Sequence, residues 1–439
     1  MAHQYGLQQD LLWTLSGGFI LLSCLIARRD DLLHPINLMI AAFAFQYLVP
    51  AVLLALDWHS PFGERFAVND AIIAYAPFGM ALVIGYMVSF VAGFSTGSRR
   101  PWGNADVEWQ PRLVWAWSLC LLALQAGLLL LLYRVGALAY SAINNDALKG
   151  TGWINYLLYA IDMIGPFYVA GSRSRSLRLL AVALYLATSV FFFVQHARGV
   201  GLMSIFWLML FYYYHGRSKF IFLFPLLLPI GIVLAAAIEI HRLADYGDAI
   251  GDVLDHFQWR YLFLNEIGRL EQLAIFLDYS VFYGVFDYGR SLAMTVFGPF
   301  AKRLFEFDDY RNAISALVYR MPTAEFASWG FGGSGVADAW MIGGPLATLL
   351  MPWGLGFAWS VAYQRVIRCR SAFNVTLYIN ISIWLLGAVL EMANLSPLWT
   401  FGVPFALLTI MTGLGGATRD RSRYAETTTA IGPLGDLAR

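Results

Sequence analysis

Length, composition and charge together indicate a protein embedded in lipid. The chain has 439 residues, of which 59% are hydrophobic and 13% charged, about half the charged share of an ordinary soluble domain. Such an apolar chain cannot cover its surface with polar atoms, so lipid must be the solvent for most of it. The net charge of +1 gives no reason to expect a nucleic-acid partner. The cysteines Cys24, Cys120 and Cys369 show no spacing typical of a zinc site, so no metal is expected.

Apolar runs along the chain predict an all-α polytopic membrane protein. A bilayer core about 30 Å thick needs about 20 mostly apolar residues per helix. The sequence predicts about eleven transmembrane helices, near residues 11–27, 36–56, 71–95, 113–133, 153–171, 178–196, 200–215, 220–240, 337–364, 374–392 and 399–416. The first run lacks a basic start and a small-residue cleavage site, which favours a retained helix over a cleaved signal peptide.

These runs divide the chain into four parts. Residues 1–240 hold helices one to eight, 241–337 form one large loop, 338–418 hold helices nine to eleven, and 419–439 form a tail. Short loops rich in Lys and Arg stay cytoplasmic. With the N-terminus outside, every second short connection is basic, and the external ones hold only Arg65, Arg134, Lys149 and Arg198. The large loop is therefore predicted to face the periplasm.

The first part of the large loop has the pattern of an amphipathic helix. Apolar residues recur at steps of three and four from Ile250 to Leu277. Such a stripe suits a helix at the membrane interface or a helix packed on the protein's own outer rim, and the sequence does not separate the two. Glycine and proline punctuate the rest of the loop into short pieces.

Ionisable residues near the membrane mark the candidate chemistry. Asp162 stands in the middle of a predicted span, where a carboxylate indicates a function or a buried partner. Arg198 lies in the short connection 195–201 between two apolar runs. Its guanidinium could bind a lipid pyrophosphate through two parallel hydrogen bonds, or extend to water from a helix end.

The loop contributes a second group of cations, Arg260, Arg269 and Arg290 among them. On one unbroken helix Arg260 and Arg269 would point in opposite directions, because residues advance by 100°. Ordinary pairing with helical neighbours such as Glu266 also accounts for them. Arg290 lies in a turn-like stretch, so neither the helical direction nor the helical pairing applies to it.

A glycine-rich stretch, residues 325–340, leads into helix nine. It has no Gly-Lys-Ser/Thr, so it is not a P-loop. Its glycines end where the helix begins, so free backbone N–H groups there could face an anion. Asp338 occupies the first turn of the predicted span, where the helix dipole stabilises a carboxylate. The same position is where a general base would be needed for a reaction at the membrane surface.

Taken together, these features resemble the bacterial O-antigen polymerase family, the Wzy-type oligosaccharide repeat-unit polymerases. The resemblance rests on the Ala197-Arg198-Gly199 turn, the large external loop after helix eight, and the residues entering helix nine. In that last stretch Asp338 takes the acidic place, Trp340 the aromatic and Gly343 the glycine. The loop pattern from Tyr279 to Arg303 is also similar. The predicted external N-terminus departs from the family's usual cytoplasmic one.

The resemblance implies a membrane-embedded glycosyltransferase with a GT-C-like fold in the bacterial inner membrane. It would transfer a glycan from undecaprenyl pyrophosphate onto another lipid-linked repeat unit at the periplasmic face, without a metal or cofactor. A chain-length regulator is a candidate partner. The implied roles place Asp338 first and Glu325 second as the base, and assign Arg198 to catalysis and pyrophosphate binding. The further pyrophosphate contacts would be Arg290, Arg269 and Arg260.

Two other functions stay open. An O-antigen ligase uses the same donor, and ligases usually carry a histidine in the large loop close to the next helix. Here the loop histidines, His241 and His256, lie far from helix nine, which favours the polymerase. A transporter of lipid-linked oligosaccharide would be expected to show internal repeats and broken helices, and the sequence shows no repeat.

Overall fold

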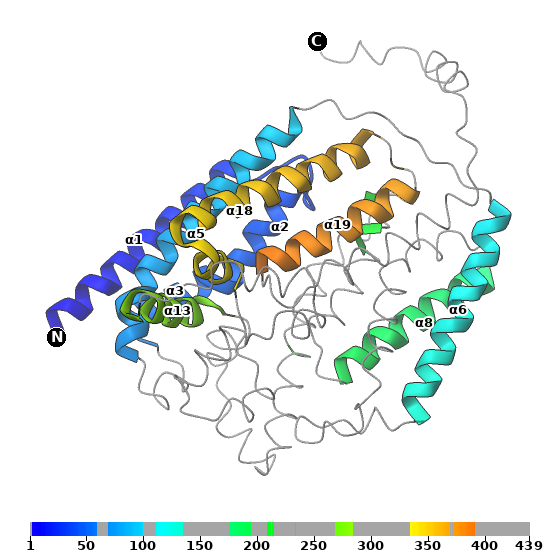
Figure 1. Ribbon diagram of the computed structural model, residues 1–439, viewed down its shortest axis with the longest axis horizontal. Helices are drawn as coiled ribbons and strands as arrows, with labels where there is room; N and C mark the ends of the chain where they lie inside the picture. The colour runs from blue at the N-terminus through cyan, green and yellow to red at the C-terminus, as the bar shows by residue number, and fades with distance from the viewer. Residues whose placement is uncertain are drawn as a thin grey trace.

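The structure is a computed structural model in which every regular element among the described residues is a helix (Figure 1). It describes residues 2–58, 69–99, 111–134, 175–194, 209–211, 213–214, 233, 268–283, 334–368, 370 and 372–390. The elements are α1 (Ala2–Ile26), α2 (Pro35–Phe43), the π-helix η1 (Ala44–Leu48), α3 (Val49–Ala55), α5 (Asn69–Ser98), α6 (Pro111–Arg134), α8 (Arg175–Val194), α13 (Leu270–Tyr283), α18 (Gly335–Arg368) and α19 (Ala372–Leu390). The predicted all-α character is confirmed for this part of the chain.

Four of these helical stretches are long and apolar enough to cross a bilayer. They are Gly6–Ile26, Pro35–Ala55, Asn69–Ser98 and Gly335–Arg368, and they coincide with the predicted runs one, two, three and nine. The chain is thus a helical membrane protein. Helices α6, α8 and α19 coincide with runs four, six and ten. Runs five and eleven lie outside the described residues, as do most of runs seven and eight, so the count of eleven stays a prediction.

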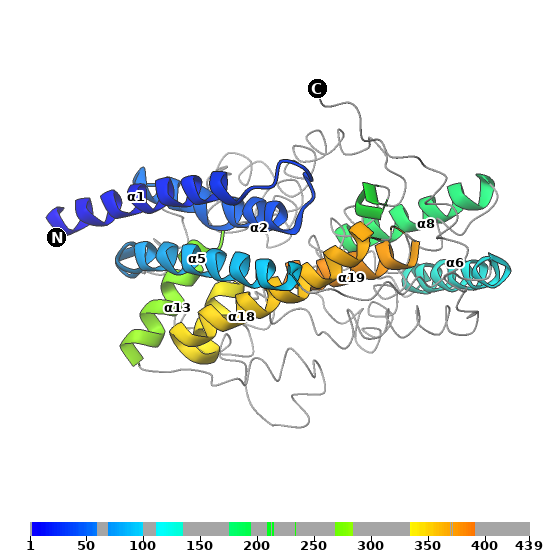
Figure 2. The same ribbon diagram turned by 90° about the horizontal axis from the view of Figure 1, so that it is seen from above.

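Glycines let α5 and α18 approach each other closely (Figure 2). Gly93 and Gly97 are four residues apart, the small-residue spacing of close helix pairs in membranes. A Cβ on Gly97 would lie 2.7 Å from the carbonyl oxygen of Phe357, and one on Gly93 would clash with the Trp353 carbonyl. From the other side, a Cβ on Gly356 would clash with the Phe90 carbonyl. The backbones of α5 and α18 therefore touch at this crossing.

Ring contacts and hydrogen bonds fix the relative directions of these helices. Phe78 packs on Trp340 at one end of the α5–α18 pair, and Phe94 on Tyr363 at the other, so the two helices run parallel. Helix α19 runs antiparallel to α18, because Trp359 donates to Ser382 at 2.8 Å while Arg365 donates to Asn374 at 2.9 Å. These directions agree with those predicted for runs three, nine and ten.

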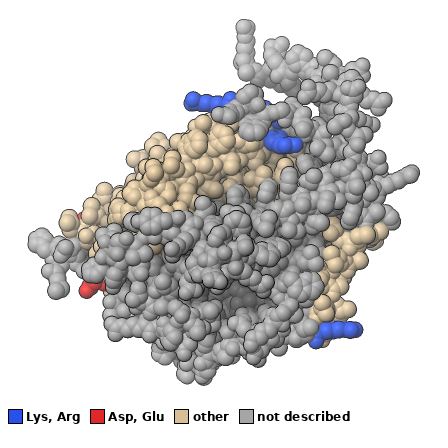
Figure 3. All heavy atoms as spheres, in the orientation of Figure 1, with Lys and Arg blue, Asp and Glu red and all other residues tan. Residues whose placement is uncertain are grey.

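Basic residues gather at the end where α1, α5 and α18 finish. The α1–α2 connection meets the last turns of α18, since Tyr363 donates to Asp31 at 2.7 Å. Figure 3 shows a broad uncharged surface on the described helices, with Arg side chains at its upper edge. The cations near these helix ends are Arg28, Arg29, Arg99, Arg365, Arg368 and Arg370. This basic end is the one that the sequence predicts to be cytoplasmic.

A compact turn joins α1 to α2. The Asn37 side chain donates to the backbone oxygens of Arg28 and Asp31 at 2.7 and 2.8 Å. His34 is the N-cap of α2, and its Nδ1 accepts from the Ile36 N–H at 3.2 Å. Nδ1 can accept only in the neutral imidazole. Burial lowers the pKa of His34 to about 4, with a smaller lowering by Arg28 and opposing effects of Asp31 and Asp30.

Gly93→Leu should destabilise the protein, since a side chain there meets the backbone of α18. Overpacking of this kind costs about 1–3 kcal/mol, so the unfolding midpoint in detergent should fall by several degrees. Gly85→Leu on the same helix is the matched control, because no atom of the described residues lies within 4 Å of its Cβ position. An equal loss in both variants would contradict the close crossing.

Acidification should destabilise the protein through His34. Its pKa is about 4 in the folded protein, against 6.5 for an ordinary exposed histidine, so the unfolded chain binds the proton more tightly. The contribution of neutral His34 is complete above pH 6.5 and is lost as the pH falls towards 4. Between pH 7 and pH 4 the midpoint of thermal unfolding should therefore fall more steeply for the wild type than for His34→Gln. Parallel curves would exclude this role.

Candidate functional site

Two of the predicted site residues, Arg269 and Asp338, belong to the described part of the chain. Arg198, Arg260, Arg290 and Glu325 lie outside the described residues, and so does Asp162. The site is therefore built from the segments that carry Arg269 and Asp338.

Asp338 lies on a short helical segment that is set off from the rest of α18. The backbone leaves the helical conformation at Gly343 (φ −166°, ψ 30°) and Gly344 (φ 59°, ψ −144°). Only glycine adopts the positive φ of Gly344 without strain, and Pro345 follows it. Residues 335–342 thus form a separate segment before the long part of α18. The sequence predicts Asp338 in the first turn of the span, and it lies in the first turn of α18; the break then separates this turn from the long part of the helix.

This short segment is buried on all sides. Residues 336–339 and Met341 are fully buried, Asp338 included, and Trp340 is 6% exposed. The Trp340 indole donates to Ser280 on α13 at 2.7 Å, and Phe78 of α5 packs edge-on against the indole ring. Ser334 caps the segment by accepting from the Ala337 N–H at 3.0 Å. Asp338 is therefore held inside the protein.

Arg269 is positioned by an irregularity in the second span. Along a regular helix the Gln46 carbonyl would bond to the N–H of residue 50, but that residue is Pro50, which has none. The chain forms the π-helix η1 here, as often happens near functional sites. The Arg269 N–H donates to the Gln46 carbonyl at 2.7 Å. This bond ties the start of α13 to the second span.

The helix predicted from Ile250 to Leu277 does not continue through Arg269. Gly268 and Arg269 are not helical, and α13 begins at Leu270. The opposite orientation expected for Arg260 and Arg269 on one unbroken helix thus does not apply. Apolar residues of α13 are buried, and Leu270 and Leu273 lie close to Gly79 of α5. For this part of the stripe, packing on the protein's own helices is the correct alternative.

Tyr47 lies near both Arg269 and Asp338, so the three residues belong to one cluster. Its hydroxyl is buried beside the Ser334 side chain and the Val336 backbone, within electrostatic range of both Arg269 and Asp338. Tyr86 of α5 is equally buried and within range of Tyr47 and Asp338. Neither tyrosine hydroxyl forms a hydrogen bond of normal geometry with any described residue. We name this group the Asp338 cluster; its members are Tyr47, Tyr86, Arg269, Ser334 and Asp338.

The Asp338 cluster combines a proton acceptor, a cation and two hydroxyl donors inside a membrane domain. Buried polar groups normally have partners, and ionisable groups within membrane helices usually mark a function. Sequence reasoning missed Tyr47 and Tyr86. The one signal for Tyr47 was the polar pair Gln46-Tyr47 ahead of Pro50 in an otherwise apolar run.

Comparison with known proteins gives no match: no family model fits the chain, and no curated protein or solved structure is similar to it.

Tyr47→Phe should leave the stability of the fold unchanged or slightly raise it. The buried hydroxyl makes no hydrogen bond of normal geometry with any described residue, so little stabilisation is lost with it, and its removal ends the cost of burying it poorly paired, about 1–3 kcal/mol. Tyr363→Phe is the matched comparison, because that hydroxyl donates to Asp31 at 2.7 Å and its loss should destabilise by about 1–2 kcal/mol. Thermal unfolding measures both. Equal destabilisation would show that the Tyr47 hydroxyl is needed for the fold.

Proposed function

We propose that the chain is a membrane-embedded glycosyltransferase that polymerises lipid-linked oligosaccharide repeat units. It transfers a glycan from undecaprenyl pyrophosphate onto a second lipid-linked unit at the periplasmic face of the bacterial inner membrane. The observation that carries the proposal is the Asp338 cluster, because it joins a carboxylate and an arginine from segments far apart in the chain. Both residues take their roles from the resemblance to O-antigen polymerases.

The proposed reaction assigns one role to each charge. The bond between the donor sugar and the pyrophosphate breaks, and the acceptor hydroxyl forms the new glycosidic bond. Asp338 takes the proton from that hydroxyl. Arg269 neutralises the charge that develops on the departing pyrophosphate, as a preorganised cation does in other phosphate-releasing reactions. Arg198, Arg260 and Arg290 are further proposed contacts of the pyrophosphate, and Glu325 is the alternative base.

The burial of Asp338 sets a requirement for this chemistry. A base must come within hydrogen-bond reach of its proton donor, and Asp338 is fully buried. We therefore infer that the segment 335–342 shifts when the acceptor binds. The break at Gly343 and Gly344 is the natural hinge, since few backbone torsions there separate the segment from the long part of α18.

A transporter of the same lipid-linked oligosaccharide is the second candidate. Transporters often bind their substrates at discontinuous helices, and α18 is discontinuous at Gly343 and Gly344. A charged group beside such a break would then bind the substrate during transport rather than react with it. The two functions differ in whether covalent bonds change.

The deciding experiment incubates the purified protein in detergent with lipid-linked repeat units and follows the glycan length. A ladder of longer glycans is expected. Polymerisation can be seen in detergent, where no bilayer separates two compartments, whereas transport cannot. Asp338→Asn should reduce chain growth at least about 100-fold, the usual effect of losing a general base. Arg269→Ala should reduce it as well, and Arg269→Lys should retain part of it.

Asp278→Asn is the matched control. Asp278 is a half-buried carboxylate of α13, and it has no part in the Asp338 cluster, so chain growth should be unchanged. Glycans that stay at unit length would contradict the polymerase. If the same protein in liposomes then moved the lipid-linked unit across the bilayer, its function would be transport.

A further inference from the structure

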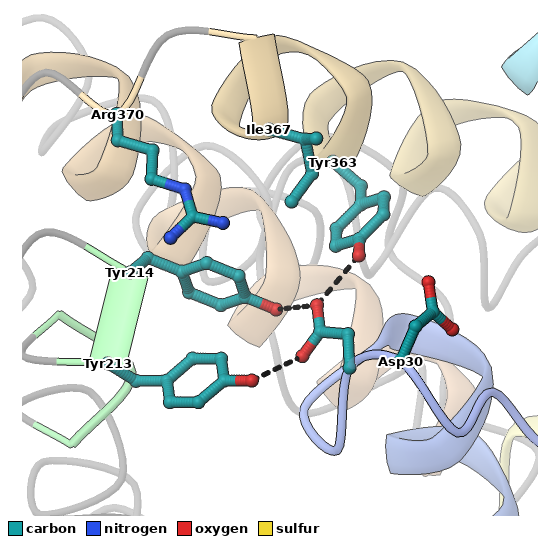
Figure 4. A pocket seen from close by; sticks show the side chains of 7 residues that line it. Asp30, Tyr213, Tyr214, Tyr363, Ile367 and Arg370 are labelled. Atoms are coloured by element: carbon teal, nitrogen blue, oxygen red, sulfur yellow. Dashed lines mark hydrogen bonds between the residues drawn. The ribbon is translucent and has the colours of Figure 1, made fainter. Parts of the chain in front are cut away.

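A pocket of about 370 Å³ lies at the basic end of the helices, where the Asp338 cluster takes no part. Its lining comes from three regions: the α1–α2 connection, residues 213–214 and the end of α18 (Figure 4). The lining residues are Asp30, Asp31, Tyr213, Tyr214, Tyr363, Ile367 and Arg370. Its volume is within the range of small-ligand pockets, about 300–1,000 Å³.

Asp31 holds the aromatic wall of this pocket in place. The carboxylate is 8% exposed and accepts three tyrosine hydroxyls, from Tyr213 at 2.9 Å, Tyr214 at 3.0 Å and Tyr363 at 2.7 Å. The Leu33 N–H donates to it as well, at 3.1 Å. With four donors its hydrogen-bonding capacity is largely met. Asp31 therefore positions the rings, and the contacts to a ligand must come from other groups.

Asp30 and Arg370 supply opposite charges at the rim. Both side chains are exposed, and both act electrostatically on the Tyr213 hydroxyl. In Figure 4 they lie on opposite sides of the pocket, with the tyrosine rings between. The rim thus presents an anion and a cation across an aromatic surface.

We propose that this pocket binds a zwitterion that carries a primary ammonium and a phosphate, as phosphoethanolamine does. The Arg370 guanidinium matches the phosphate oxygens. The ammonium binds to the Asp30 carboxylate and lies against the tyrosine faces, which attract cations. A ligand with only a negative charge would be repelled by Asp30 and Asp31, and one with only a positive charge by Arg370.

The position of the pocket favours the headgroup of a phospholipid as the source of this zwitterion. The pocket opens among the helix ends that carry Arg28, Arg29 and Arg368, and basic residues gather where a membrane surface is anionic. Ile367, which lines the pocket, is 39% exposed, so an acyl chain could continue along α18. Free phosphoethanolamine shares the polar chemistry without that apolar contact.

The test uses the purified full-length protein, with bound lipid measured by native mass spectrometry and stability by thermal unfolding. Phosphatidylethanolamine should be retained and should raise the unfolding midpoint. Phosphatidylglycerol should bind about tenfold more weakly or worse. Phosphatidylcholine should also be weaker, because its quaternary ammonium donates no hydrogen bond to Asp30. Free phosphoethanolamine, added without lipid, should bind weakly; binding as tight as that of the lipid would identify a soluble ligand.

Variants decide whether the rim charges are responsible. Asp30→Asn and Arg370→Ala should each weaken phosphatidylethanolamine binding about tenfold, while Arg368→Ala, an exposed neighbour outside the pocket, should not. Thermal unfolding without lipid checks that the variants fold. Equal binding of phosphatidylglycerol and phosphatidylethanolamine, or unchanged binding in both rim variants, would overturn the proposal. Because the assay involves no glycan, its result is independent of the proposed enzymatic function.

Discussion

The contact between the backbones of α5 and α18 determines where both polar sites stand. Gly93, Gly97 and Gly356 remove the side chains that would hold the helices apart, so α18 lies in one fixed register along α5. That register places Trp340 against Phe78 at one end and Tyr363 against Phe94 at the other. The Asp338 cluster and the pocket around Asp31 thus lie at the two ends of the α5–α18 pair. A change in the crossing would displace both.

Irregular backbone is what brings polar groups into this apolar fold. Within a bilayer, backbone that departs from a helix persists only where protein or an aqueous cavity satisfies it. The π-helix η1 meets this condition because Gln46 accepts from Arg269. At the break in α18 the buried Gly344 accepts from the Thr348 hydroxyl at 2.9 Å. Both irregularities arise at proline or glycine, and both border the Asp338 cluster. The Asp338 cluster therefore occurs where the helical pattern fails.

Much of the helical framework could be predicted from local sequence, whereas the sites could not. Apolar runs predicted the spans of α1, α5 and α18, and the glycines before Val336 predicted the start of α18. The proximity of Tyr47 to Asp338 depends on packing between segments almost 300 residues apart, which no local pattern contains. Asp31 was hidden for another reason: beside Arg28 and Arg29 it was one more loop charge, although three distant tyrosines bury it. The break in α18 could have been suspected from Gly343-Gly344-Pro345 alone.

The hydrogen bonds of Asp31 also have a consequence for the order in which the protein folds during synthesis. Asp31 leaves the ribosome in the first tenth of synthesis, but its partners Tyr213 and Tyr214 follow only near the middle of the chain and Tyr363 much later. Until then the carboxylate must stay hydrated at the membrane surface, since an unpaired charge is costly to bury. Asp31 thus gains its full set of donors only after Tyr363 of α18 has been made. Chains truncated before Tyr363 would lack one of the three tyrosine donors that hold this carboxylate.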